Sequence, residues 1–267
     1  MNEEEAFIRA IVGNPGDDLP RLVYADWLDD RDDPRGAYLR AECEAVETGD
    51  VARLRKLAVG LDPVWVARVS MPPVGVCISG IQFTDHGWRP ATANIIEAER
   101  KLGIVFAADY KAFLLNYNGG WIDVDVESET PAGESVRYPT GMGWRFHPIE
   151  RVDRFALRPD DILPTDFVSR LGLPPLTEPI ENWVSRFVVI GRDPDLIGTI
   201  FLGVSGADRG HVRILDTSVE LESGVRYNIG SPPYAASFAD FLEHVLGRSL
   251  DSPPPLGDDS DTEPIPF

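Results

Sequence analysis

The sequence has few of the residues that build metal, redox or membrane sites. Its 267 residues include two cysteines and four histidines, and Cys43 and Cys77 form no CxxC motif. Their spacing indicates no zinc or redox site, so we expect buried free thiols in a reducing compartment. No apolar run approaches the roughly 18–20 residues of a membrane-spanning helix. The acidic first residues lack the basic segment of a secretory signal, and we expect a soluble cytoplasmic protein without cofactor or metal.

Positive charge is also scarce. The chain has 25 lysines and arginines against 44 aspartates and glutamates, which gives a net charge of −19. Such a field repels nucleic acid and anionic membranes, and it attracts basic proteins. The alternative is an acidic surface that only keeps the protein soluble. We therefore expect neither nucleic acid nor a membrane as a partner.

Residues 1–70 predict a small helical module. Apolar residues recur at helical spacing, and turn-forming residues divide the segment into four helices. These breaks are Asn14-Pro15-Gly16, Pro34 and Thr48-Gly49-Asp50. Residues 71–87 predict a linker containing a strand, because apolar and small residues alternate there. The alternating apolar residues are Val74, Val76, Ile78 and Ile81.

Residues 88–247 predict a second unit of helices and strands. Helical spacing indicates three helices, over residues 92–102, 108–117 and 237–246. Strands are expected at residues 121–127, 187–190, 198–204 and 211–215, while residues 129–149 favour a loop. The order indicates an α+β chain with a mainly antiparallel sheet flanked by helices. The acidic, proline-rich tail of residues 248–267 is expected to be disordered.

Helix 108–117 is followed by two glycines. Its apolar stripe must be buried, whereas Lys111 and Asn116 lie off the stripe and should face water. The stripe consists of Tyr110, Phe113, Leu114 and Tyr117. Asn118-Gly119-Gly120 suits a helix end, where carbonyl groups point outward and repel anions. A phosphate-binding loop would need glycines before a helix, so the sequence favours a helix stop.

Several separated segments carry a family resemblance. "IIEAERKLGIVFAADYKAFLLNYNGG" resembles the N-terminal signature of the SUKH superfamily, also called the SMI1/KNR4 family. "RFVVIGRD", "GHVRILD" and "YAASFADFLEHVL" resemble later strands and the closing helix of that family, in the same order. Ala107 replaces a usual proline, and the segment before "TIFLGV" also departs from the pattern. The resemblance covers about residues 88–247.

The SUKH resemblance implies a fold that acts by binding another protein. Many bacterial members are similar to immunity proteins that neutralise toxins, often nucleases, and a basic nuclease would suit the charge of −19. The resemblance therefore predicts a non-enzymatic binding module, with a basic toxin as one expected partner. The family also resembles a fungal cell-wall regulator, so a regulatory or scaffold protein with the helical module as adaptor is an alternative.

The first 42 residues carry a second resemblance. "MNEEEAFIRAIVGNPGDDLPRLVYADWLDDRDDPRGAYLRAE" is similar to the repeat-companion domain of bacterial, mainly planctomycete, proteins. Asp33 departs from the glycine usual in that family. The resemblance implies a helical module at the start of varied proteins.

A hydrolase is the less favoured alternative. No G-x-S-x-G motif occurs, and none of the histidines has a neighbour at metal-ligand spacing. They are His86, His147, His211 and His244. We therefore expect no catalytic, cofactor-binding or metal-binding residues.

The predicted partner-binding residues lie on the first strand of the second unit. Trp121 begins the strand, and period-2 alternation places Asp123, Asp125 and Glu127 on one face. An acidic face can attract a basic protein over long range. The alternative is an ordinary solvated sheet face.

Overall fold

The structure is a computed structural model that describes most of the chain. It covers residues 3–78, 88–129, 135–154, 178–192, 199–215, 219–221, 224–226 and 233–243. Only the backbone is described for residues 46–47, 122–129, 135–144, 180, 215, 219–221 and 224–226. The predicted tail of residues 248–267 and the position of Ile81 lie outside the described residues.

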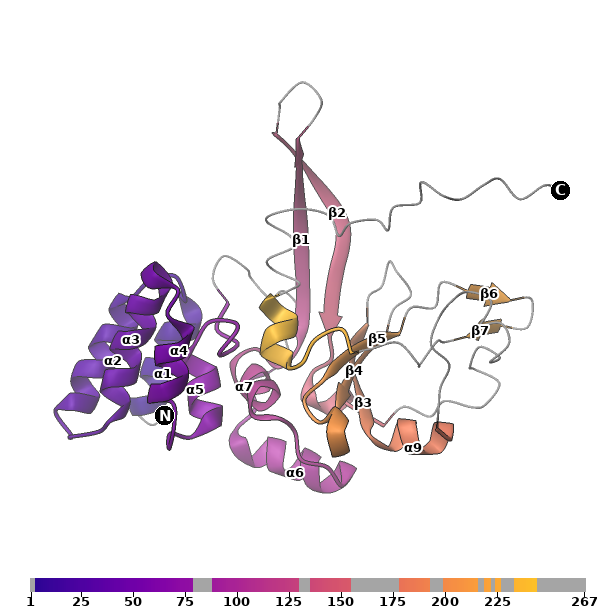
Figure 1. Ribbon diagram of the computed structural model, residues 1–267, viewed down its shortest axis with the longest axis horizontal. Helices are drawn as coiled ribbons and strands as arrows, with labels where there is room; N and C mark the ends of the chain where they lie inside the picture. The colour runs from indigo at the N-terminus through magenta and orange to yellow at the C-terminus, as the bar shows by residue number, and fades with distance from the viewer. Residues whose placement is uncertain are drawn as a thin grey trace.

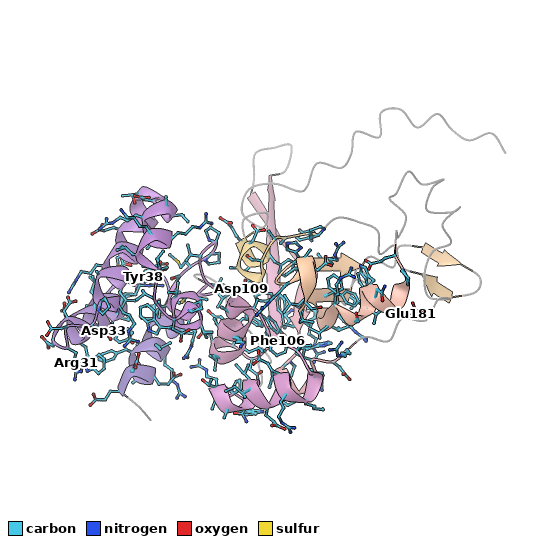
Figure 2. The ribbon with its side chains drawn as sticks, turned by 60° about the horizontal axis from the view of Figure 1, so that its bottom comes forward. Arg31, Asp33, Tyr38, Phe106, Asp109 and Glu181 are labelled. Atoms are coloured by element: carbon cyan, nitrogen blue, oxygen red, sulfur yellow. The ribbon has the colours of Figure 1, made fainter. Side chains whose placement is uncertain are left out.

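Five helices form an N-terminal bundle (Figure 1). They are α1 (Glu3–Gly13), α2 (Leu19–Asp29), α3 (Arg35–Thr48), α4 (Val51–Leu57) and α5 (Pro63–Val69). Their core contains Tyr24, Tyr38 and Trp65, whose rings meet edge to face. Tyr38 lies between the helices (Figure 2). The sequence missed α5, although Asp62 accepts a hydrogen bond from the Val64 N–H and Pro63 opens the helix.

The second unit combines helices with an antiparallel sheet, as predicted. Helices α6 (Thr92–Leu102) and α7 (Ala108–Asn116) precede a five-stranded sheet in the order β1-β2-β3-β4-β5. The strands are β1 (Gly120–Glu129), β2 (Ser135–Phe146), β3 (Phe187–Arg192), β4 (Thr199–Gly203) and β5 (Val212–Leu215). Short elements are η1 (Ile149–Arg151), α9 (Ile180–Ser185), η3 (Gly206–Asp208), β6 (Val219–Leu221) and β7 (Gly224–Arg226). The α+β class is confirmed.

One face of the sheet packs against α7 and a helix at residues 238–243. Phe113 and Phe238 lie 4.8 Å apart between ring centroids, and both contact Phe146 of β2. Asp109 fixes this last helix, because its Oδ2 accepts hydrogen bonds from the Phe238 and Ala239 N–H groups at 2.8 and 3.0 Å. Figure 2 shows Asp109 beside that helix.

The strand predicted within residues 71–87 is wrong for the part that the structure describes. Residues 74–78 form no strand, although Val76 and Ile78 are buried. Their backbone follows α5, since the Val76 N–H donates to the Ala67 carbonyl at 2.8 Å. The side chains of residues 76–78 enter two different cores. Their alternation therefore reflects burial between two units rather than strand pairing.

The loop predicted at residues 129–149 is also wrong, because β2 occupies most of it. The glycines and Pro139 of this segment are typical of loops, so the sequence pattern did not indicate a strand. β2 pairs with β1 from end to end except at residues 140–142, where the register shifts, yet it reaches β3 only at Arg145 and Phe146. Pro139 lies in the part of β2 that has β1 as its only described partner strand. Proline is tolerated on such an edge because the ladder needs no N–H there.

Asn116 does not face water as predicted, because the helical bundle covers that side of α7. Its side chain is 1% exposed. Arg68 Nε donates to Asn116 Oδ1 at 3.0 Å, and Asn116 Nδ2 donates to the Arg68 carbonyl at 3.0 Å. Arg68 also holds both carboxylate oxygens of Glu5 at 2.9 Å. Burial raises the pKa of Glu5, but Arg68 outweighs it, so the net pKa is lowered.

Replacing Arg68 tests this junction. Arg68→Gln should lower the free energy of unfolding by about 2–3 kcal/mol, because it removes a charged hydrogen-bond pair and leaves Asn116 Oδ1 buried without a donor. Arg9→Gln is the matched control, since exposed Arg9 touches the same Glu5 at 3.5 Å and should cost less than about 0.5 kcal/mol. Urea unfolding at neutral pH measures both.

The loss of unfolding free energy in Arg68→Gln should also depend on pH. The folded pKa of Glu5 lies below its ordinary value of 4.5, so the stabilisation is full above that pH. It is lost as pH falls through the folded pKa. Equal losses for Arg68→Gln and Arg9→Gln would show that the junction contributes no stability.

Candidate functional site

A long hairpin projects from the sheet (Figure 1). β1 and β2 pair on both sides of one register shift, but within the described chain only Arg145 and Phe146 of β2 also pair with β3. Residues 122–129 and 135–144 therefore form an arm whose described outer edges are unpaired. Eight residues of strand span roughly 25 Å. Unpaired backbone groups on such edges can accept a strand from another chain.

The four predicted binding residues lie on β1. Trp121 lies where the arm leaves the sheet, and Asp123, Asp125 and Glu127 follow it along the arm. Their Cα partners on β2 are Arg145, Gly143, Pro139 and Arg137, in that order. The register shifts between Asp123 and Asp125. The structure describes only the backbone of the three acids, so the acidic face stays a prediction.

Two arginines lie beside Trp121 at the foot of the arm. Arg145 is the Cα partner of both Trp121 and Arg192, so these three residues form a row across β1, β2 and β3. The row lies on the sheet face opposite Phe146, which faces the helices. Like charges directly opposite each other on neighbouring strands are destabilising. Fold stability therefore does not explain why Arg145 and Arg192 lie opposite each other.

A third arginine, Arg151, acts on His147 together with Arg145 and Arg192. Burial lowers the pKa of His147, and the charges of Arg192, Arg151 and Arg145 lower it further. We call these three arginines the arginine cluster. All three side chains are exposed, and no ion pair or side-chain hydrogen bond joins them to any acid in the described residues. The buried Nδ1 of His147 also has no hydrogen-bond partner there.

Asn118 and Gly119 position this region. Asn118 is fully buried with φ of 54°, and its Nδ2 donates to the Trp88 carbonyl at 2.6 Å. Its Oδ1 accepts from the Ile149 N–H at 2.9 Å. Gly119 has φ of 83°, and a Cβ there would lie 2.6 Å from the Pro148 nitrogen. The Asn-Gly-Gly segment thus fastens the start of β1 to the chain on either side of it.

Trp88 adds an exposed aromatic side chain to the same region. It is 55% exposed, and its Nε1 donates to Glu150, the neighbour of Arg151. We call Trp88, Trp121 and the arginine cluster the foot surface. Tryptophan and arginine are enriched among the residues that dominate binding energy at protein interfaces. The foot surface therefore has the composition of a protein-binding site.

Sequence reasoning found Trp121 but missed the arginines. Arg145 lies in the segment predicted as loop, and Arg192 is the last residue of β3, far along the chain. No local pattern connects them, because only strand pairing brings β1, β2 and β3 side by side.

A concavity of about 390 Å³ lies between the helical bundle and the second unit. Its charged lining is mostly paired already, which weakens it as a binding site. Glu4 pairs with Arg35, Glu5 with Arg68, and Glu99 with Lys111.

No cluster of three or more histidine, cysteine, aspartate or glutamate residues that could hold a metal occurs among the described residues. In the same part of the chain, no helix has the length and apolar character needed to cross a membrane.

Gly119→Ala tests the close approach at the start of β1. The variant should lose about 3 kcal/mol of stability, since a left-handed backbone and a clash with residue 148 add together. Gly49→Ala is the matched control, because Gly49 also has positive φ, 69°, but nothing lies within 4 Å of its added Cβ. It should lose about 1–2 kcal/mol. Thermal unfolding measures both, and equal losses would contradict the steric role of Gly119.

Comparison with known families identifies the family of the second unit. Residues 90–244 match the model of the SMI1/KNR4 family (SUKH-1). No curated protein matches the sequence. The match begins after the helical bundle, so the resemblance of the first 42 residues to the repeat-companion domain stays a prediction. Because the match spans more than half of the 267 residues, the chain belongs to the SMI1/KNR4 family (SUKH-1).

Proposed function

We propose that the protein is a non-enzymatic binding module that holds another protein against the arm and the foot surface. The single observation that carries this proposal is the arm itself. A two-stranded hairpin that extends beyond its sheet is marginally stable alone, and its edges can pair with a partner strand. Family membership supports the same conclusion, because the SUKH resemblance implies action by binding.

The partner we propose is a basic toxin of the nuclease type, which the module neutralises as an immunity protein. The net charge of −19 supports this, because it would accelerate the approach of a basic protein. Asp123, Asp125 and Glu127 would supply the short-range part of the attraction from the arm.

Neutralising the arm tests this function. Asp123→Asn/Asp125→Asn/Glu127→Gln should weaken binding to a co-purifying product of a neighbouring gene by about tenfold or more at low salt. The matched control is Asp30→Asn/Glu181→Gln/Glu243→Gln, which changes the net charge equally at exposed acids outside the arm. Glu181 lies on α9, away from the helical bundle (Figure 2).

Titration calorimetry at several salt concentrations gives both affinities. Two results would contradict the proposal: the absence of any partner, or equal losses for the arm variant and its control.

A regulatory or scaffold protein is the second candidate, favoured by α2. Leu19, Leu22 and Val23 occupy its solvent side at 64%, 36% and 47% exposure. Three such residues at helical spacing suit contact with a further protein. In this function the helical bundle is the adaptor.

Point variants test the adaptor better than deletion of the bundle, because Ala67, Val76 and Ile78 belong to the core of the second unit. Leu22→Gln/Val23→Gln should remove at least one protein from the set that co-purifies with the chain. Val59→Gln, at an apolar residue with 81% exposure, is the control and should leave the set intact. An unchanged set for the α2 variant would exclude the adaptor role.

A further inference from the structure

The arginine cluster brings three positive charges together on a protein whose net charge is −19. Several other arginines have acidic partners: Arg186 pairs with Glu178 and Asp208 at 2.5 and 2.7 Å, and Arg40 pairs with two aspartates of α2. With 44 acids against 25 basic residues, such partners are plentiful. The arginine cluster is nevertheless unpaired within the described residues, at one place on the surface.

Strand pairing makes this arrangement unfavourable for the free protein. Arg145 and Arg192 are direct cross-strand partners, so their guanidinium groups leave neighbouring strands on the same face. Arg151 adds a third positive charge that acts on the same half-buried His147. A local arrangement that opposes stability, with no acidic partner among the described side chains, indicates a functional site.

The guanidinium groups of the arginine cluster favour binding of an anion that has two neighbouring oxygen atoms. Guanidinium groups form bidentate hydrogen bonds with carboxylates and phosphates, and they keep their charge at every physiological pH. A nucleic acid is disfavoured, because its extended charge would meet the field of a chain with net charge −19. A few carboxylates on a protein surface avoid that repulsion, because salt limits the reach of the field to about 8–10 Å.

We propose that the foot surface binds carboxylate side chains of the partner protein, with Arg145, Arg192 and Arg151 as the pairing groups. This inference rests on the proposed function and adds the chemistry of the partner to it. Trp121 lies opposite Arg145, Trp88 bonds to Glu150 next to Arg151, and the two tryptophans supply apolar contact area. The partner then presents acidic residues to the foot while its basic face meets the arm. Such a bipolar contact fixes one orientation of the partner.

A hexaglutamate peptide is the probe, used with the full-length protein. Wild-type protein should bind it, and Arg145→Gln/Arg192→Gln should weaken binding by about fivefold to tenfold. The control is Arg55→Gln/Arg209→Gln, which removes two exposed arginines without a described ion-pair partner elsewhere on the surface. It should change the affinity by less than about twofold.

A second readout locates the peptide. The ring of His147 should titrate at higher pH when hexaglutamate is bound to wild-type protein, because the peptide offsets the arginine charges that lower the pKa of His147. NMR of the ring protons follows this change. In Arg145→Gln/Arg192→Gln the free protein should already show part of the increase, and the peptide should add little.

Three results would overturn the inference: no binding of hexaglutamate to wild-type protein, equal losses in the variant and the control, or inorganic phosphate binding at least as tightly as the peptide. These results leave the arm experiment untouched, since that experiment uses the co-purifying partner and the acids of β1. Conversely, a negative arm experiment with positive peptide binding would reject the proposed function and keep an anion site.

Discussion

The reciprocal hydrogen bonds between Arg68 and Asn116 couple the two units of the protein. They join α5 to α7, and Arg68 reaches Glu5 of α1 at the same time. Helix α7 is therefore buried on both sides, against the sheet through Phe113 and against the bundle through Asn116. An exposed amphipathic helix would bury one stripe only. The position of the sheet relative to the bundle depends on this helix.

The end of α7 also sets the position of the candidate site. Asn118 lies two residues after Asn116 and fixes the residues around Trp88 and Ile149 against the start of β1. Gly119 permits that approach because it has no side chain. One short segment thus connects the junction between the units with the foot of the arm. The glycines have a structural role, and the binding groups lie on the strands beyond them.

Most elements followed from local pattern, and the errors have a common cause. Alternation around Val76 suggested a strand, but it arises from burial between two cores. Glycines and Pro139 suggested a loop, but β2 is stabilised by pairing with β1. Asn116 is polar and was expected to face water, yet it is satisfied by Arg68 from a distant helix. In each case a tertiary neighbour supplied the partner that local reasoning could not see.

By itself, the sequence determined the α+β class, the order of most helices and strands, the helix stop at Asn118 and the family of residues 90–244. These features depend on side-chain periodicity and turn chemistry, which act over a few residues. Only the tertiary structure decided that β2 extends β1 into an arm and that Arg145 faces Arg192. Strand register joins residues far apart in the chain, and no local pattern encodes it.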